Sequence, residues 1–109
     1  MTTVFSAALG VCGLTGPVAA ELLGYSLGSI KAWSSGATSP PIDAWKRLAG
    51  LYEQIVTVSE AALDEYELDD LDMKALNRVS VIATGEPLPV EGAQAAAVAM
   101  FVLARFADE

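Results

Sequence analysis

Two successive pairs of helix start and stop signals constrain this chain most strongly. The first pair begins at Thr15, a residue type that caps helix N-termini, and ends at Gly24, because glycine favours the left-handed backbone that terminates helices. The second pair begins at Ser26 and ends at Gly36. Since only Tyr25 separates the two signals, the pattern predicts two short helices joined by a tight turn.

Apolar residues at helical spacing accompany these signals. In the second helix Ile30 and Trp33 lie on one face and are expected to be buried. In the first helix the residues expected inside are Leu14, Ala19, Leu22 and Leu23. Residues 2–12 predict an earlier helix with a threonine cap, whose apolar face consists of Val4, Phe5, Ala8, Leu9 and Cys12.

A longer helical repeat begins after Ser39, Pro40 and Pro41, which are expected to form its cap and first turn. Because the repeat keeps its phase across Gly50, we expect one long helix. Further helices are predicted over about 71–84 and 90–107. The residues of the long repeat are Ile42, Trp45, Leu48, Ala49, Tyr52, Ile55, Val56, Ser59, Ala62, Leu63 and Tyr66.

These patterns predict an all-α fold of five or six helices. With 53% hydrophobic and 18% charged residues, the chain is too apolar to be disordered. We expect a helix-turn-helix domain over residues 1–66, which includes the long helix, and an acidic helical segment over residues 67–109. The two tryptophans, Trp33 and Trp45, are expected in the core, whereas Tyr25 can either pack or donate to a phosphate.

The last helix predicts a homodimer. A helix that is apolar on nearly every side has to be buried on several sides, and a chain of 109 residues is too small to surround it alone. The predicted dimer core consists of Val98, Met100, Phe101, Leu103 and Phe106.

Several kinds of chemistry are excluded. The chain has no histidine, which a Ser-His-Asp triad and most catalytic zinc sites require. Its single cysteine, Cys12, cannot form an internal disulfide and is expected to be buried. The acidic stretch 65–72 lacks the spacing of a calcium loop, and Glu21 and Asp43 have no partner for acid-base work. We therefore expect no enzymatic activity, no metal and no cofactor.

Membrane contact is not expected either. The longest apolar run, residues 95–104, has about half the roughly 20 residues needed to span a bilayer. No signal peptide is recognisable at the start of the chain, so a cytoplasmic location is expected.

The net charge of -8 is unevenly distributed. Residues 1–50 carry three basic and two acidic side chains, whereas residues 51–109 carry three basic and twelve acidic ones. Only the first half is therefore expected to approach a polyanion.

The first half resembles a known family of DNA-binding proteins. The residues that carry the resemblance are Leu14, Ala20, Gly24, Ser26, Ile30, Trp33, Gly36 and Pro41. Over about residues 4–55 they resemble the lambda-repressor/Cro-like helix-turn-helix family, also called the xenobiotic-response-element family. The stretch SIKAWSSGATSPP, the long helix and the Gln94 segment also resemble the small YdiL and anti-CRISPR-associated regulators, in which a C-terminal helix forms the homodimer.

The resemblance implies that the helix after Ser26 enters the major groove of double-stranded operator DNA. Carried over by position, the base-facing residues are Leu27, Gly28, Lys31 and Ala32. The residues implied near phosphates are Gly16, Ser26, Ser29, Ser35, Thr38, Ser39, Lys46 and Arg47. Since Leu27, Gly28 and Ala32 have no side-chain hydrogen-bonding groups, readout through thymine methyl groups, Lys31 and DNA shape is expected. Ordinary solvation remains the alternative for Lys31, Lys46 and Arg47.

The sequence therefore predicts a sequence-specific, homodimeric DNA-binding transcriptional regulator, and the resemblance implies a repressor of phage or mobile-element promoters. The alternative is a protein-interaction module on the same scaffold. As an adaptor or antirepressor it would bind another protein through the weakly polar helix after Ser26 in place of DNA. Its acidic second half could then bind a basic partner or act as a DNA mimic.

Overall fold

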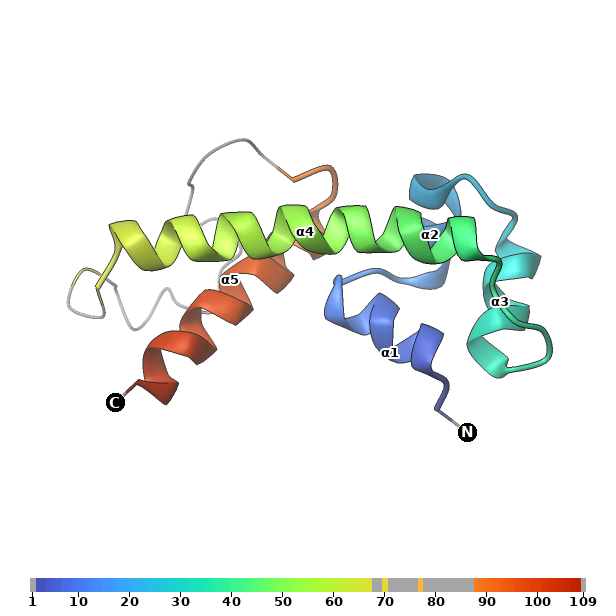
Figure 1. Ribbon diagram of the computed structural model, residues 1–109, viewed down its shortest axis with the longest axis horizontal. Helices are drawn as coiled ribbons and strands as arrows, with labels where there is room; N and C mark the ends of the chain where they lie inside the picture. Colours follow the sequence, from blue (N-terminus) through green and yellow to red (C-terminus); the bar gives the residue numbers. More distant parts are fainter. Residues whose placement is uncertain (1, 68–69, 71–76, 78–87, 109) are drawn as a thin grey trace. The chain divides into compact units, whose positions relative to one another are not determined.

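The computed structural model describes residues 2–67, 70, 77 and 88–108, and this part of the chain is helical, with no strand. The all-α prediction is confirmed there. The helix predicted over about 71–84 lies, apart from Asn77, outside the described residues. The elements are α1 (Val4–Val11), α2 (Gly16–Leu23), α3 (Leu27–Ser35), α4 (Ile42–Glu65) and α5 (Glu91–Ala107) (Figure 1).

The chain divides into two compact units, Met1–Tyr52 and Glu53–Glu109. The boundary between them falls inside α4. As predicted, α4 passes through Gly50 without a break (Figure 1). The expected functional division into residues 1–66 and 67–109 stays a prediction.

Side-chain caps begin the first three helices, as the sequence predicted. Thr3, Thr15 and Ser26 each accept a hydrogen bond from the amide three residues ahead, which satisfies a donor that has no partner within the helix. Gly24 and Gly36 end α2 and α3 in the left-handed conformation, at φ 80° and 86°.

The start of α4 differs from the prediction. Ser39 was expected to cap a helix whose first turn contains Pro40 and Pro41, but α4 begins at Ile42. The carbonyl of Pro41 accepts from the amides of Ala44 at 3.0 Å and Trp45 at 3.4 Å. Pro41 therefore occupies the cap position, where its missing N–H has no helical partner to lose.

An aromatic cluster holds the first unit together. The Phe5 ring of α1 lies edge-on to Trp33 of α3 and to Trp45 of α4, both at 5.6 Å between ring centroids. Tyr25 packs against Trp33 at 5.0 Å. The buried side chains around them are Leu9, Cys12, Leu14, Ala19, Leu23, Ile30, Ala44, Leu48 and Leu51. The prediction that Ile30 and Trp33 face the core is confirmed.

Two details of the predicted apolar faces are wrong. Val4 is 77% exposed, because it occupies the first turn of α1, where the buried face begins only at Phe5. In α4 the first buried residues are Ala44, Leu48 and Leu51, whereas Ile42 and Tyr52 are exposed. When apolar residues flank each other on a helix, periodicity alone does not tell which of them faces the core.

In the second unit α5 packs against the end of α4. Ala62 of α4 is buried with Val98 and Phe101 of α5, and the neighbouring Leu63, Tyr66 and Val102 are partly buried against them. The Tyr66 and Phe101 rings meet edge-on at 6.4 Å. Among the described residues of the second unit, this contact forms an apolar cluster.

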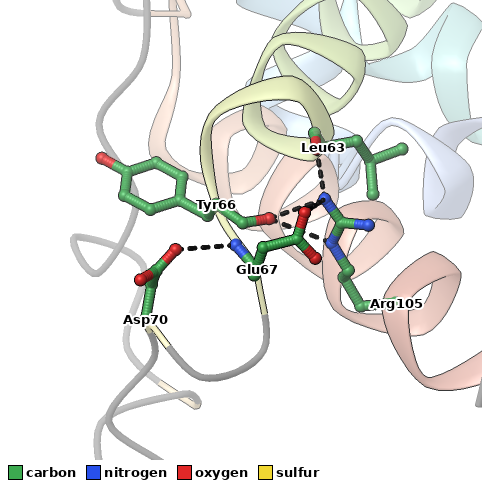
Figure 2. A network of polar contacts seen from close by, with 5 residues as sticks. All are labelled: Leu63, Tyr66, Glu67, Asp70 and Arg105. Atoms are coloured by element: carbon green, nitrogen blue, oxygen red, sulfur yellow. Dashed lines mark hydrogen bonds and ion pairs between the residues drawn. The ribbon is translucent and has the colours of Figure 1, made fainter.

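The side chain of one arginine caps the C-terminal end of α4 (Figure 2). Arg105 of α5 donates hydrogen bonds to the carbonyls of Leu63 and Tyr66. Its guanidinium also lies 3.8 Å from a carboxylate oxygen of Glu67 and 5.9 Å from the centre of the Phe101 ring. Because helix C-termini carry carbonyls without helical partners and a partial negative charge, a cation there is favourable.

Among the described helices, none is by itself both long enough and apolar enough to cross a membrane. Only α1 and α2 taken together reach that length and composition, and they are bent by 84°.

Candidate nucleic-acid interface

The outward face of α3 carries the four residues predicted to face bases. Successive helical residues are turned by about 100°, so Leu27, Gly28, Lys31 and Ala32 share one side of the helix. The buried residues Ile30 and Trp33 lie on the opposite side. Leu27, Gly28 and Lys31 are exposed and Ala32 is half-buried. The structure thus brings the predicted set together on one accessible surface.

The starts of α2 and α3 adjoin each other. A methyl group placed on Gly16 would lie 3.7 Å from Cδ1 of Leu27. Gly16 and Leu27 therefore belong to one continuous surface, although eleven positions separate them in the chain.

Few backbone donors remain at these two helix starts. In α2 the amide of Val18 is bonded to the Thr15 hydroxyl, and Pro17 has no N–H, which leaves the amide of Gly16. In α3 the amides of Leu27 and Gly28 precede the first helical hydrogen bond, from Ile30 to the Ser26 carbonyl. Amides at helix N-termini suit anions such as phosphate.

Three of the four serines implied near phosphates, Ser26, Ser29 and Ser35, have partners within the chain. The Ser26 hydroxyl donates to Oγ of Ser29 at 2.9 Å and accepts from its amide at 3.1 Å. The Ser35 hydroxyl donates to the carbonyl of Ala32 and accepts from the amide of Ala37. Ser26 therefore caps the start of α3, and Ser35 bonds to backbone groups at its end. Thr38 and Ser39 are exposed in the segment that follows α3.

The three basic residues of the first unit differ in their surroundings. Lys31 and Lys46 are exposed on α3 and α4. Arg47 instead donates from Nη1 to the carbonyl of Leu23 at 2.6 Å, and its guanidinium lies 5.3 Å from the centre of the Tyr25 ring. Arg47 is exposed as well, but unlike the two lysines it has a carbonyl and an aromatic ring of its own chain as partners.

The residues predicted to form a dimer core fall into two groups. Val98 and Phe101 are buried against α4 of the same chain, at 6% and 0% exposure. Within one chain α4 covers this face of α5, and the assignment of these two residues to a surface between subunits stays a prediction. Leu103 and Phe106 are 69% and 44% exposed and Met100 is partly exposed, so these three residues remain accessible.

Cys12 lies at an apolar hollow of about 220 Å³ in the first unit. The hollow is lined by Ala8, Val11 and Cys12 of α1 and by Trp45, Leu48, Ala49 and Tyr52 of α4. Burial raises the pKa of the Cys12 thiol above its ordinary value, so the thiol stays protonated and weakly nucleophilic at neutral pH. The expectation that Cys12 is buried is confirmed.

The acidic junction contains an ordinary turn where it is described. The amide of Glu67 donates to Oδ2 of Asp70 at 2.9 Å (Figure 2). Asp69 and Asp72 lie outside the described residues. Within the described ranges, no three His, Cys, Asp or Glu side chains are grouped as metal ligands would be.

Sequence reasoning missed the partners of Arg47 and Arg105. The partner of Arg47, Leu23, is 24 positions away, and the partners of Arg105 are 39 and 42 positions away. The only local signal was the position of Arg105, a lone cation in the last turn of a mostly apolar helix. No local pattern pointed to the pairing of Arg47 with Tyr25.

The protein belongs to the all-α class. Its first unit contains the short helices α2 and α3, which are joined by a tight turn. Comparison with protein-family models, curated proteins and solved structures gives no match. The resemblance to the lambda-repressor/Cro-like family stays an expectation from the sequence.

Proposed function

We propose that this chain is a sequence-specific, homodimeric DNA-binding transcriptional regulator of the helix-turn-helix type, and that it acts as a repressor in the cytoplasm. Its role is to bind DNA, not to catalyse a reaction. The observation that carries the proposal is the outward face of α3, where Leu27, Gly28 and Lys31 are exposed opposite the buried Ile30 and Trp33.

In this proposal α3 lies in the major groove and α2 crosses the phosphate backbone. Lys31 is the polar group of the face and contacts a guanine edge or a phosphate. Leu27 and Ala32 contact thymine methyl groups, and Gly28 lets the backbone approach the base edges closely. The amides of Gly16 and Leu27 face phosphates.

The charge distribution supports the same assignment. The first unit carries three basic and two acidic side chains, although the whole chain has a net charge of -8. Exposed carboxylates more than about 8 Å from a phosphate are largely screened at physiological salt. The acidic second unit therefore permits DNA binding, provided that it does not touch the DNA.

We assign dimerisation to the accessible part of α5, with Leu103 and Phe106 at its centre and Met100 beside them. Apolar side chains exposed along a helix are stabilised when a symmetric copy covers them. A two-fold dimer would present two copies of α3 to two half-sites of an operator.

The test is a fluorescence-anisotropy titration of the full chain against duplex DNA from upstream of its own gene, at two salt concentrations. Saturable binding that weakens as salt increases supports the proposal, because phosphate contacts release counterions. A duplex of scrambled sequence is the control for specificity. Absence of saturable binding at low salt contradicts the proposal.

A protein-interaction module is the second candidate, and the exposure of Leu27 favours it. An exposed apolar residue at the start of α3 also suits a groove on another protein, and α3 offers only one charged side chain. In this case the chain binds no duplex in the titration, and Leu27→Asp abolishes co-purification of a protein partner.

A further inference from the structure

Arg47 connects α4 to the turn between α2 and α3. From α4 its Nη1 donates to the carbonyl of Leu23, the last residue of α2, at 2.6 Å. This carbonyl belongs to the set at a helix C-terminus that has no partner within the helix. A charged donor forms a stronger hydrogen bond with it than a neutral donor does.

The same guanidinium also reaches the turn itself. Its carbon lies 5.3 Å from the centre of the Tyr25 ring, within the range of a cation–π contact. The Tyr25 ring in turn packs edge-on against Trp33 of α3, at 5.0 Å between centroids. Arg47, Tyr25 and Trp33 thus form a continuous contact path from α4 through the turn into α3.

The backbone of the turn lies close to Nη1 of this arginine, whose side chain is otherwise exposed. Gly24 has φ 80°, and a methyl group added to it would lie 3.1 Å from Nη1 of Arg47. The arginine therefore lies directly against the left-handed residue that sets the direction in which α3 leaves α2.

We propose that Arg47 is a positioning residue for α3: it holds the turn between α2 and α3 against α4 through Leu23 and Tyr25, and does not neutralise a DNA phosphate. This inference rests on the proposed function, since DNA is the ligand that α3 is positioned to bind. It separates Arg47 from its neighbour Lys46, which the sequence placed in the same phosphate-contacting set.

The discriminating variant is Arg47→Lys in the full chain. Lysine keeps the positive charge and binds phosphate well as a point charge, but it lacks the planar group that stacks on Tyr25 while donating to Leu23. The probe is a fluorescent duplex that the wild-type chain enriches from a random-sequence library. Affinity is measured by anisotropy over a series of KCl concentrations.

If Arg47 positions α3, Arg47→Lys weakens binding at every salt concentration, roughly tenfold, with an unchanged slope of log affinity against log salt. In the matched control, Lys46→Met, the loss of one phosphate contact per subunit makes the slope of the dimer shallower by about 2. An Arg47→Lys variant with wild-type affinity overturns the proposal, because a phosphate contact tolerates this exchange.

Tyr25 supplies a second, independent pair of variants in case Arg47→Lys does not fold. Tyr25→Leu removes the ring that receives the guanidinium and is expected to weaken binding with an unchanged slope. Tyr25→Phe keeps the ring and is expected to bind like wild type. Wild-type affinity in Tyr25→Leu contradicts the positioning role.

Near-ultraviolet circular dichroism separates failure of this inference from failure of the proposed function. Arg47→Lys is expected to change the aromatic signal, since Tyr25 and Trp33 lose a fixed neighbour. If the wild-type chain enriches no DNA, the proposed function fails, whereas an unchanged aromatic spectrum overturns the packing role of Arg47 whether or not DNA binds.

Discussion

Arg105 donates two hydrogen bonds to the single carbonyl oxygen of Tyr66, from Nε at 3.0 Å and from Nη2 at 2.7 Å (Figure 2). This pairing joins the last turn of α5 to the end of α4. It also places a positive charge where Asp64 and Glu65 would otherwise leave only negative charge at a helix C-terminus.

Replacing this arginine is therefore expected to destabilise the second unit. Arg105→Met removes the bonds to Leu63 and Tyr66 while keeping much of the apolar stem, and we expect a loss of about 2 kcal/mol in the free energy of unfolding. The matched control is Glu67→Gln, whose side chain is 77% exposed, and its expected cost is below about 1 kcal/mol. Urea unfolding followed by circular dichroism measures both, and equal effects would contradict the role of the carbonyl contacts.

Two glycines are expected to respond to alanine in opposite directions. Gly24→Ala forces a side chain into the left-handed region and toward Arg47, at an expected cost of about 1–2 kcal/mol. Gly50→Ala meets nothing within 4 Å inside α4 and is expected to stabilise the chain by about 0.5–1 kcal/mol. Thermal unfolding of the two variants checks the signs, and stabilisation by Gly24→Ala would contradict the geometry of the turn.

The dimer assignment is tested by one substitution on the exposed face of α5 and one on the face that packs against α4. Leu103→Asp is expected to convert a dimer into a folded monomer, because Leu103 is 69% exposed in the single chain. Phe101→Ala empties part of the core of the second unit and is expected to cost about 3–5 kcal/mol of stability. Sedimentation velocity with far-ultraviolet circular dichroism distinguishes the two effects. A Leu103→Asp variant that still sediments as a dimer would refute the interface.

Cys12 is expected to resist thiol reagents in the folded chain. Cys12 as a residue is 2% exposed, so reaction at neutral pH should be slow until urea unfolds the protein. Its raised pKa also gives a pH dependence. The folded chain ionises Cys12 at a higher pH than the unfolded chain does, so stability is lost as the pH rises above the ordinary thiol value of about 8.5. Cys12→Ala should lack this component, and a wild-type thiol that reacts at the unfolded rate would contradict burial.

Readout through methyl groups can be tested on the DNA. In a duplex enriched by the wild-type chain, replacing thymidine by deoxyuridine removes only the C5 methyl groups. Each contacted methyl is expected to contribute about 0.8 kcal/mol, roughly fourfold in affinity. Lys31→Ala should weaken binding to both duplexes. Equal affinity of wild type for the two duplexes would exclude Leu27 and Ala32 from base recognition.

Local chemistry in the sequence determined where the helices of the first unit begin and end. Thr15, Ser26, Gly24 and Gly36 act on backbone groups within a few positions, so their effect can be predicted without knowing the rest of the fold. The side of α3 that faces outward followed in the same way from Ile30 and Trp33. The candidate DNA-reading surface could thus be predicted as a surface before its surroundings were known.

Tertiary packing decided which residues share that surface and which instead contact other parts of the same chain. Arg47 is bonded to Leu23, and Phe101 is covered by α4 of its own chain. Both contacts join residues far apart in the sequence, and apolar periodicity or charge does not specify a distant partner. The reason is physical: capping is a short-range backbone interaction, whereas the choice of a through-space partner depends on how whole helices pack.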